Sequence, residues 1–331
     1  LVLMGYRIVR PEIGSTDHRK PLLAKAGIYL GLTGVCTVLF WPFLWSNPVL
    51  HFVEAFREMR SYPWEGTVLY RGEFIPATGL PWHYIPVWLA ITTPLGYSLG
   101  FVTGSILGAW RLVRGVKAGC PEVEKHVPLI LFWGPLLVIV VSGATLYDGW
   151  RHMFYIYPYF ILVTVGGFRF LAETLTRRVR GGMGKPILWA SAAAVVVHLL
   201  FIGHFMFKYH PHQNVYFNRL AGPDMATVKT QYELDYWGGV FKQGLEYIVR
   251  NDLSEKISYY ADQPPGYFNR AMLPKGDRDR LVMAASIEEA DYFITSFRWH
   301  PEHYPYEEYH SILVGNAEVL TIYRPNRVVP R

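Results

Sequence analysis

The chain has 331 residues, of which 51% are hydrophobic, and it contains 11 Trp and 23 Tyr. This composition is too apolar and aromatic for an average soluble protein and is typical of membrane spans with interfacial aromatic residues. The net charge of +6 is unevenly divided, because residues 1–207 hold 18 Lys and Arg against 10 Asp and Glu (+8), whereas residues 208–331 hold 14 against 16 (−2). No basic face or nucleic-acid motif accompanies the excess, so it indicates membrane topology and excludes a nucleic-acid partner.

Five stretches are long enough to cross a bilayer as helices of about 20 residues. They are Ala26–Trp45, Ile85–Trp110, Val127–Leu146, Phe154–Thr174 and Pro186–Phe207. Lys and Arg gather before the first stretch, between the second and third, and between the fourth and fifth, so these loops are predicted to be cytoplasmic. The opposite side then receives residues 46–84, a short loop at Asp148 and everything after Phe207.

The sequence therefore predicts a multi-pass α-helical membrane domain of about five spans over residues 1–207. A small α/β or α+β domain outside the cytoplasm is expected over residues 208–331. In the first outer loop, apolar residues recur at helical spacing, which predicts an amphipathic helix at about 49–60 on the membrane surface. An integral membrane protein is therefore expected.

The last 124 residues of the chain carry a helix signal followed by strand signals. Phe241, Leu245 and Ile248 mark one face of a helix. Strands are expected at Lys256–Ala261, Leu281–Ala285, Asp291–Ser296, Tyr309–Val314 and Glu318–Tyr323. Gly315, Asn316 and Ala317 between the last two predict a hairpin.

Several common signals are missing from the sequence. Cys36 lies in an apolar run and Cys120 in a basic loop, so neither a disulfide nor a Cys-based metal site is expected. The sequence holds no Walker A loop, HExxH, CxxC or GxSxG motif. Because the chain starts at Leu1, with no initiator Met and what resembles the tail of an apolar helix, we expect it to be the C-terminal part of a longer protein.

The strongest candidate site is the short polar loop that holds Asp148, Arg151 and His152 between two apolar runs. Arg151 can clamp a phosphate bidentately and His152 can assist, at the depth where a lipid-phosphate donor presents its phosphate. The alternative is an ordinary interfacial turn in which Asp148 pairs with Arg151.

Two further groups are candidates. Trp82, His83 and Tyr84 lie between two prolines where the chain re-enters the bilayer, and they form either a pocket entry or an aromatic belt. Glu233 and Asp235 share one side of an extended segment, where they can hold an acceptor or a divalent ion. The alternative is a structural segment whose Tyr232, Tyr236 and Trp237 pack the outer domain onto the membrane part. His210 and His212 are weaker metal ligands, since no third ligand is evident.

Three motifs carry a resemblance to a known family. They are Leu80-Pro-Trp-His-Tyr84 followed by Thr92-Thr-Pro94, then Arg151-His-Met-Phe-Tyr-Ile-Tyr-Pro158, then His210-Pro-His-Gln-Asn-Val-Tyr-Phe-Asn218 with Tyr232-Glu-Leu-Asp-Tyr-Trp-Gly238. In these the chain resembles the C-terminal half of integral-membrane GT-C glycosyltransferases of the dolichyl-phosphate-mannose protein mannosyltransferase-like and aminoarabinose-transferase-like groups.

The resemblance implies transfer of a sugar from a polyprenyl-phosphate donor to a protein or glycan acceptor on the outer side of the membrane. Asp148, Arg151 and His152 would contact the donor phosphate, and Trp82, His83 and Tyr84 would form the pocket entry. Family members place a catalytic Asp in the first outer loop near the N terminus, and residues 46–84 contain no Asp, so the general base is expected outside this chain and no catalytic residue is assigned. No cofactor or metal site is certain, although a divalent metal is possible.

A second hypothesis is a non-catalytic integral-membrane scaffold or accessory subunit that binds lipid or a protein partner. A transporter is the weaker third hypothesis, because the predicted spans hold few ionisable groups and no paired interrupted helices.

Overall fold

The computed structural model describes residues 19–60, 64–118, 123–178 and 184–328. The chain forms two compact units, each discontinuous in sequence. Unit 1 takes Leu1–Trp64, Leu99–Thr145 and His152–Glu173, and unit 2 takes Glu65–Ser98, Leu146–Arg151 and Thr174–Arg331. The predicted division at residue 207 follows chain order, whereas unit 2 combines segments from both sides of that residue. Cys120 lies outside the described residues.

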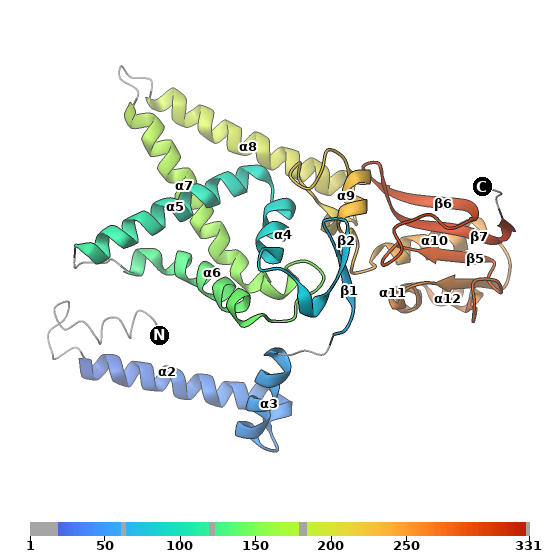
Figure 1. Cartoon of the computed structure of the whole chain (residues 1–331), viewed down its shortest axis with the longest axis horizontal. Coiled ribbons are helices and arrows are strands. Elements are labelled where there is room, and N and C mark those ends of the chain that lie inside the picture. Colours follow the sequence, from blue (N-terminus) through green and yellow to red (C-terminus); the bar gives the residue numbers. More distant parts are fainter. Residues whose placement is uncertain (1–18, 61–63, 119–122, 179–183, 329–331) are drawn as a thin grey trace. The chain divides into compact units, whose positions relative to one another are not determined.

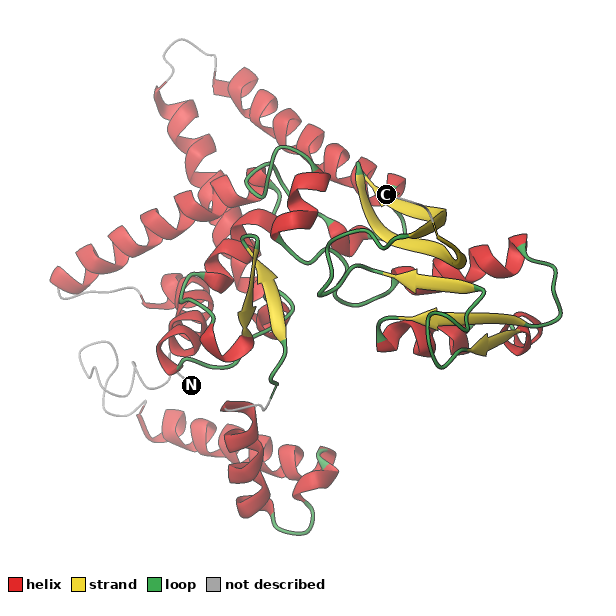
Figure 2. Cartoon of the chain, turned by 45° about the vertical axis from the view of Figure 1, so that its right-hand side comes forward, coloured by secondary structure: helices red, strands yellow, loops and turns green. Residues whose placement is uncertain are grey.

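Unit 1 is helical, as Figure 2 shows. Its elements are α2 (Arg19–Phe40), η3 (Pro42–Leu44), α3 (Pro48–Arg60), α6 (Val123–Ser142) and most of α5 (Leu95–Lys117), η5 (Arg151–Ile156) and α7 (Tyr157–Arg178). The helix expected at about 49–60 is α3. Its apolar stripe is exposed, as a helix lying on a membrane surface requires; the stripe consists of Val49, Phe52, Val53 and Phe56.

Four helices among the described residues are long and apolar enough to cross a membrane: Leu23–Phe40, Val123–Ser142, Arg151–Thr176 and Leu188–Lys208. They match the first, third, fourth and fifth predicted spans. The second predicted span, Ile85–Trp110, is not one helix, because the chain breaks into α4 (Tyr84–Thr92) and α5. Thr93 is extended at the break, as expected before Pro94, which disfavours helical backbone in the preceding residue. The total of about five spans stays a prediction.

Glycines let α5 and α7 cross with their backbones in contact (Figure 1). A Cβ on Gly167 of α7 would lie 1.9 Å from the carbonyl oxygen of Gly100 on α5, and a Cβ on Gly104 would lie 2.1 Å from that of Val163. No larger residue fits at either position without moving a helix. Small residues four apart are the pattern that lets membrane helices approach this closely.

Unit 2 is mixed. Its N-terminal segments are β1 (Thr67–Tyr70), β2 (Glu73–Pro76), η4 (Ala77–Gly79), α4 and residues 146–151. Its C-terminal helices are α8 (Gly184–Lys208), η6 (Gln213–Val215), α9 (Met225–Gln231), α10 (Val240–Asn251), α11 (Pro264–Phe268), η7 (Asn269–Met272) and α12 (Lys275–Arg280). Its remaining strands are β3 (Ile257–Ala261), β4 (Leu281–Met283), β5 (Tyr292–Thr295), β6 (Tyr306–Val314) and β7 (Ala317–Val328).

The five predicted C-terminal strands are confirmed and form one sheet of order β4-β3-β5-β7-β6. Strands β4, β3 and β5 are parallel, and β7 runs antiparallel to both β5 and β6. The predicted hairpin is also confirmed, because Val314 pairs with Ala317 across a two-residue turn. Its first residue, Gly315, has φ +65°, which a side chain rarely tolerates.

The core of the C-terminal part lies between the sheet and α10. Phe241, Leu245 and Ile248, the predicted apolar face, are completely buried. Each buried side chain of this size contributes roughly 1.5–3 kcal/mol. The sequence did not suggest two elements, the β1–β2 hairpin and α9, which contact each other. The amide of Gly72 donates to the carbonyl of Gln231 (3.1 Å), and Tyr70 forms an isolated antiparallel β-bridge with Tyr232. This places β1 beside Glu233.

Candidate functional site: an arginine–carboxylate cluster in unit 2

A tight turn presents Asp148 inside unit 2. Asp148 and Gly149 have φ of +55° and +69°, the left-handed pair that Asp-Gly favours in tight turns. The turn is held against α4, because the Gly149 amide donates to the hydroxyl of Tyr84 (3.0 Å) and the Trp150 indole donates to Thr92 (3.0 Å). Asp148 is only 5% exposed, so its carboxylate needs cationic partners.

Two arginines supply those partners. Arg151 Nη2 lies 3.1 Å from Asp148 Oδ2, and Arg298 Nη2 donates to Asp148 Oδ1 at 2.6 Å. The Arg151 guanidinium also lies over the rings of Tyr147 (4.7 Å) and Trp237 (4.9 Å). Carboxylate and rings together fix the orientation of this guanidinium.

Arg298 comes from a strained loop after β5. Its neighbours Phe297 and Trp299 have φ of +61° and +65°, and with Asp148 they are three of the four described non-glycine residues with positive φ. Each such residue costs of order 1–3 kcal/mol, and such strain concentrates at functional sites. The loop is tied down where the Trp299 indole donates to the carbonyl of Thr67 (2.8 Å).

Glu233 is the fourth member of the cluster. Its Oε1 lies 3.6 Å from Arg298 Nε, which is too long for a good hydrogen bond. Burial raises the pKa of Glu233 to about 7, while the charge of Arg298 and the amide of Leu69 lower it and Asp148 raises it. Glu233 therefore exchanges a proton near neutral pH. We refer to Asp148, Arg151, Glu233 and Arg298 as the arginine–carboxylate cluster.

The hydrogen-bonding capacity of the cluster is not used up. The Nε atoms of Arg151 and Arg298 and the Oε1 atom of Glu233 are buried without a hydrogen-bond partner among the described residues. Two of these atoms, Arg298 Nε and Glu233 Oε1, lie 3.6 Å apart as a long ion pair. Because most buried polar atoms are hydrogen-bonded, this loose pair and Arg151 Nε point to a missing group or to stored strain. The adjacent cavity, lined by Tyr236 and Arg298 among others, holds about 30 Å³.

The predicted site residues have different fates in the structure. Asp148 and Arg151 do meet, which is the pairing that the interfacial-turn alternative predicts, so contact of either residue with a phosphate stays a prediction. His152 is counted with unit 1 and is exposed, so its contact with a phosphate stays a prediction. Glu233 belongs to the cluster, whereas the carboxylate of Asp235 accepts from Asn214 (2.8 Å) and from the amide of Val240 (2.9 Å). Asp235 thus fixes the start of α10.

The three residues of the expected pocket entry also lie in different environments. Trp82 is 71% exposed, which suits an interfacial belt residue. His83 Nδ1 shares a hydrogen bond of 2.7 Å with the hydroxyl of Tyr70. Tyr84 is buried and supports the Asp148 turn, so it is a positioning residue for the cluster.

The histidines do not form a shared metal site. His210 pairs with Gln213 (2.7 Å) and His212 with Gln243 (2.5 Å). Within the described ranges, the ligand atoms that gather closely enough for a metal ion belong to one group, His303, Glu308 and Glu318. There the ammonium of Lys229 already lies 3.0 Å from Glu318, so a cation occupies this position and no metal is assigned.

Sequence reasoning missed Arg298. It follows the predicted strand Asp291–Ser296 and stands between two large aromatic residues, Phe297 and Trp299. This position, a cation between aromatic residues just after a strand, is the local signal that could have indicated it. A hydrogen bond across 150 positions of the chain, such as that between Arg298 and Asp148, is invisible to local patterns.

No family model matches this sequence, and comparison with curated proteins and with solved structures gives no significant match. The resemblance to GT-C glycosyltransferases therefore rests on the sequence motifs alone.

Proposed function

We propose that this protein is an integral-membrane glycosyltransferase of the GT-C type that takes a sugar from a polyprenyl-phosphate donor. The observation that carries the proposal is the pair of preoriented guanidiniums, Arg151 and Arg298, with orphaned Nε atoms beside a buried carboxylate. Planar guanidiniums recognise phosphate oxygens through paired N–H groups. The motif similarity around Arg151 supports the same assignment.

Charge within the cluster fits the binding of an anion. With Asp148 and Glu233 both ionised, the two arginines are neutralised. Protonation of Glu233, whose pKa is about 7, leaves a net charge of +1. An incoming phosphate can supply the compensating negative charge and satisfy the orphaned donors.

In the proposed reaction, the bond between the sugar and the lipid phosphate breaks while an acceptor hydroxyl bonds to the sugar. Arg151 and Arg298 would stabilise the negative charge that develops on the departing phosphate. Tyr84 would hold the Asp148 turn in position. No described carboxylate is assigned as the base that removes the acceptor proton.

The proposal extends to the surroundings of the enzyme. The membrane is a bacterial inner membrane, the C-terminal sheet domain lies outside the cytoplasm, and the acceptor is a protein or glycan there. The positive-inside distribution of Lys and Arg supports this orientation.

The test is transfer of radiolabelled sugar from polyprenyl-phosphate donors, in membranes that contain the full chain. Arg298→Lys keeps a charge beside Asp148 but loses the planar fork. We expect transfer to fall about 100-fold or more, as when a charge-stabilising donor is lost. Arg250→Lys is the matched control, because Arg250 is an exposed residue of α10 whose contact is a 3.8 Å ion pair with Glu246. Equal transfer by both folded variants would contradict the phosphate assignment.

A second candidate function, a non-catalytic membrane scaffold, is favoured by one observation. The cavity at the cluster holds about 30 Å³, which is room for little more than one water molecule. In that case the arginines only tie the Asp148 turn to the Arg298 loop. Absence of transfer by the wild-type full-length protein with every donor, together with a lower melting temperature of Arg298→Lys, would favour the scaffold.

A further inference from the structure

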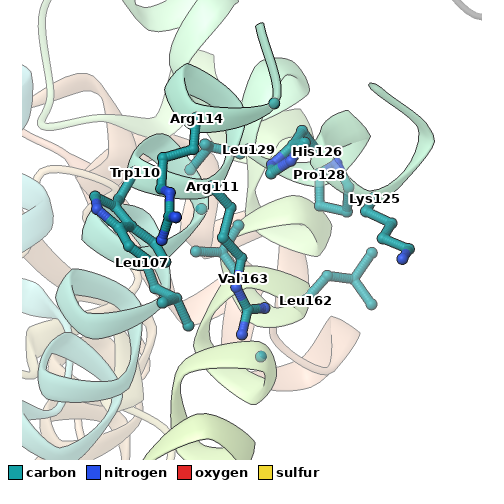
Figure 3. Close-up of a pocket in the computed structure, with 14 residues that line it drawn as sticks. Leu107, Trp110, Arg111, Arg114, Lys125, His126, Pro128, Leu129, Leu162 and Val163 are labelled. Atoms are coloured by element: carbon teal, nitrogen blue, oxygen red, sulfur yellow. The ribbon is translucent and has the colours of Figure 1, made fainter. Parts of the chain in front are cut away.

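Unit 1 contains a larger cavity that the proposed function does not use. It has a volume of about 480 Å³ and lies between the C-terminal half of α5, the start of α6 and the middle of α7. Figure 3 shows its labelled side chains, with Arg111 and Arg114 on α5 and Lys125 and His126 on α6. The volume is within the range of roughly 300–1,000 Å³ that is common for small-molecule sites.

The wall of this cavity is divided by polarity. Arg111, Arg114 and Lys125 come from the helix ends that face the loop between α5 and α6. The apolar wall consists of Leu107, Leu129, Leu162 and Val163. Because a helix rises about 1.5 Å per residue, Arg111 and Arg114 lie within roughly 10 Å of the end of α5 at Lys117. A ligand with a polar group near the helix ends and an apolar chain along the leucine and valine side chains would therefore contact a matching surface at both places.

Among the described residues, the guanidiniums of Arg111 and Arg114 contact aromatic rings and no acids. The Arg111 guanidinium lies 6.0 Å from the ring of Phe170, and that of Arg114 lies 4.7 Å from the ring of Trp110. Neither is ion-paired with a carboxylate anywhere in the described ranges. Lys125 and His126 make contacts of their own, so the two arginines alone are assigned to a ligand. Their charges are open to an anionic ligand.

We propose that this cavity binds the phosphate-bearing headgroup of an anionic membrane lipid. Arg111 and Arg114 would contact the phosphate, and an acyl chain would lie along Leu107 and Leu162. Basic pockets between helices, at the side of the membrane that carries the excess of Lys and Arg, suit such headgroups. The apolar wall distinguishes a lipid from free phosphate, which would leave that wall unused. This site is independent of the arginine–carboxylate cluster, since all its lining residues belong to unit 1.

Trp110 lines the cavity and provides a local readout. The full chain is reconstituted in phosphatidylcholine vesicles that contain increasing fractions of brominated phosphatidylglycerol, which quenches nearby tryptophans. The quenching of Trp110 is obtained by subtracting that of the Trp110→Phe variant. We expect saturable quenching that weakens with salt, because charge contributes to binding.

The decisive comparison is between two changes of charge on α5. The double variant Arg111→Gln with Arg114→Gln should raise the half-saturating lipid fraction about tenfold or more, since each cation near an anionic surface contributes to binding. Lys117→Gln removes a charge from the exposed end of the same helix but does not alter the lining, and it should change this fraction less than about twofold. Equal effects of the two changes would overturn the site.

A second variant leaves every charge in place. Gly166 lines the cavity and has no atom within 4 Å of the position of an added Cβ, so Gly166→Leu extends into open space. It should weaken lipid quenching, whereas Gly134→Leu on α6, also unobstructed but outside the lining, should not. Unchanged quenching in Gly166→Leu would contradict the acyl-chain position. Displacement of the lipid by millimolar inorganic phosphate would assign the arginines to a soluble phosphate and overturn the lipid assignment.

Discussion

Two pairs of arginines, one pair in each unit, are used in opposite ways. In unit 2, Arg151 and Arg298 are largely buried and share one carboxylate, so they fix the geometry of two loops. In unit 1, Arg111 and Arg114 are exposed and rest on aromatic rings, with no carboxylate partner among the described residues. A buried charge must be compensated by the protein, whereas an exposed charge stays available to a ligand. Loss of an arginine of the first pair should therefore lower stability as well as the proposed phosphate binding, whereas loss of one of the second pair should affect mainly binding.

The two units also differ in packing. The largest expected effect is that of a substitution that disrupts the helix packing of unit 1. Gly167→Val would place side-chain atoms against the backbone of Gly100 and Gly104. We expect the free energy of unfolding to fall by more than about 4 kcal/mol, since backbone must move. Denaturation in mixed micelles, followed by helicity, measures it. Gly166→Val, one residue away in open space, should be nearly neutral, and equal losses would contradict the close crossing.

The next effect concerns the buried cluster of unit 2. Arg298→Ala leaves Asp148 and Glu233 short of a cation, and breaking a buried pair in this way costs about 3–5 kcal/mol. Arg250→Ala, an exposed control on α10, should stay within about 0.5 kcal/mol. Thermal unfolding of both variants checks the difference. A loss below about 1 kcal/mol for Arg298→Ala would show that the cluster is as weak as an exposed ion pair.

Glu233 makes the stability of unit 2 depend on pH. Its pKa rises from 4.5 to about 7 on folding, chiefly through burial. The folded state therefore holds the extra proton, and this stabilising contribution is full below pH 4.5 and is lost as pH rises through 7. Relative to the Glu233→Gln variant, the free energy of unfolding of the wild type should fall by up to about 3 kcal/mol between pH 4.5 and 8, as denaturation at each pH would measure. Asp262, whose pKa is also raised, to about 6, is present in both proteins and cancels. A constant difference over this range would contradict the raised pKa.

The smallest predicted effect concerns the break between α4 and α5. The side-chain amide of Asn218 donates to the carbonyls of Ala90 (2.6 Å) and Thr93 (2.6 Å). Asn218→Ala leaves these acceptors unpaired and should cost about 1–3 kcal/mol in unfolding free energy. Asn251→Ala, which removes one exposed bond to the carbonyl of Tyr247, should cost less than half as much. Indistinguishable melting curves for the two variants would contradict this role.

Periodic patterns predicted the elements that pack along one face. The α10 stripe was predicted because Phe241, Leu245 and Ile248 recur at helical spacing, and these side chains are buried. The five C-terminal strands were predicted as short runs rich in apolar residues, and they form one sheet. Four of the predicted spans correspond to helices long and apolar enough to cross a membrane. The break at Thr93 was missed because hydropathy does not register the backbone effect of Pro94.

Only half of the cluster could be predicted from the sequence. Asp148 and Arg151 are three residues apart, so their pairing is local, and the interfacial-turn alternative contained it. Arg298 and Glu233 reach Asp148 through the fold of distant segments, and nothing local encodes that approach. The strained backbone at Phe297 is likewise a product of tertiary packing. Glu233 and Asp235 both carry a carboxylate but lie in different environments, Glu233 in the cluster and Asp235 at the start of α10.

The contact of Asn218 with the end of α4 has a consequence for biosynthesis. Asn218 is 125 residues later in the chain than Thr93, whose carbonyl it binds. A ribosome that adds about 5–20 residues per second needs roughly 6–25 s to span that interval. During this time the end of α4 must take its hydrogen bonds from water, lipid headgroups or the insertion machinery. The α4–α5 break therefore reaches its final form only after the C-terminal segment has been synthesised, which makes this joint a late step in the maturation of the protein.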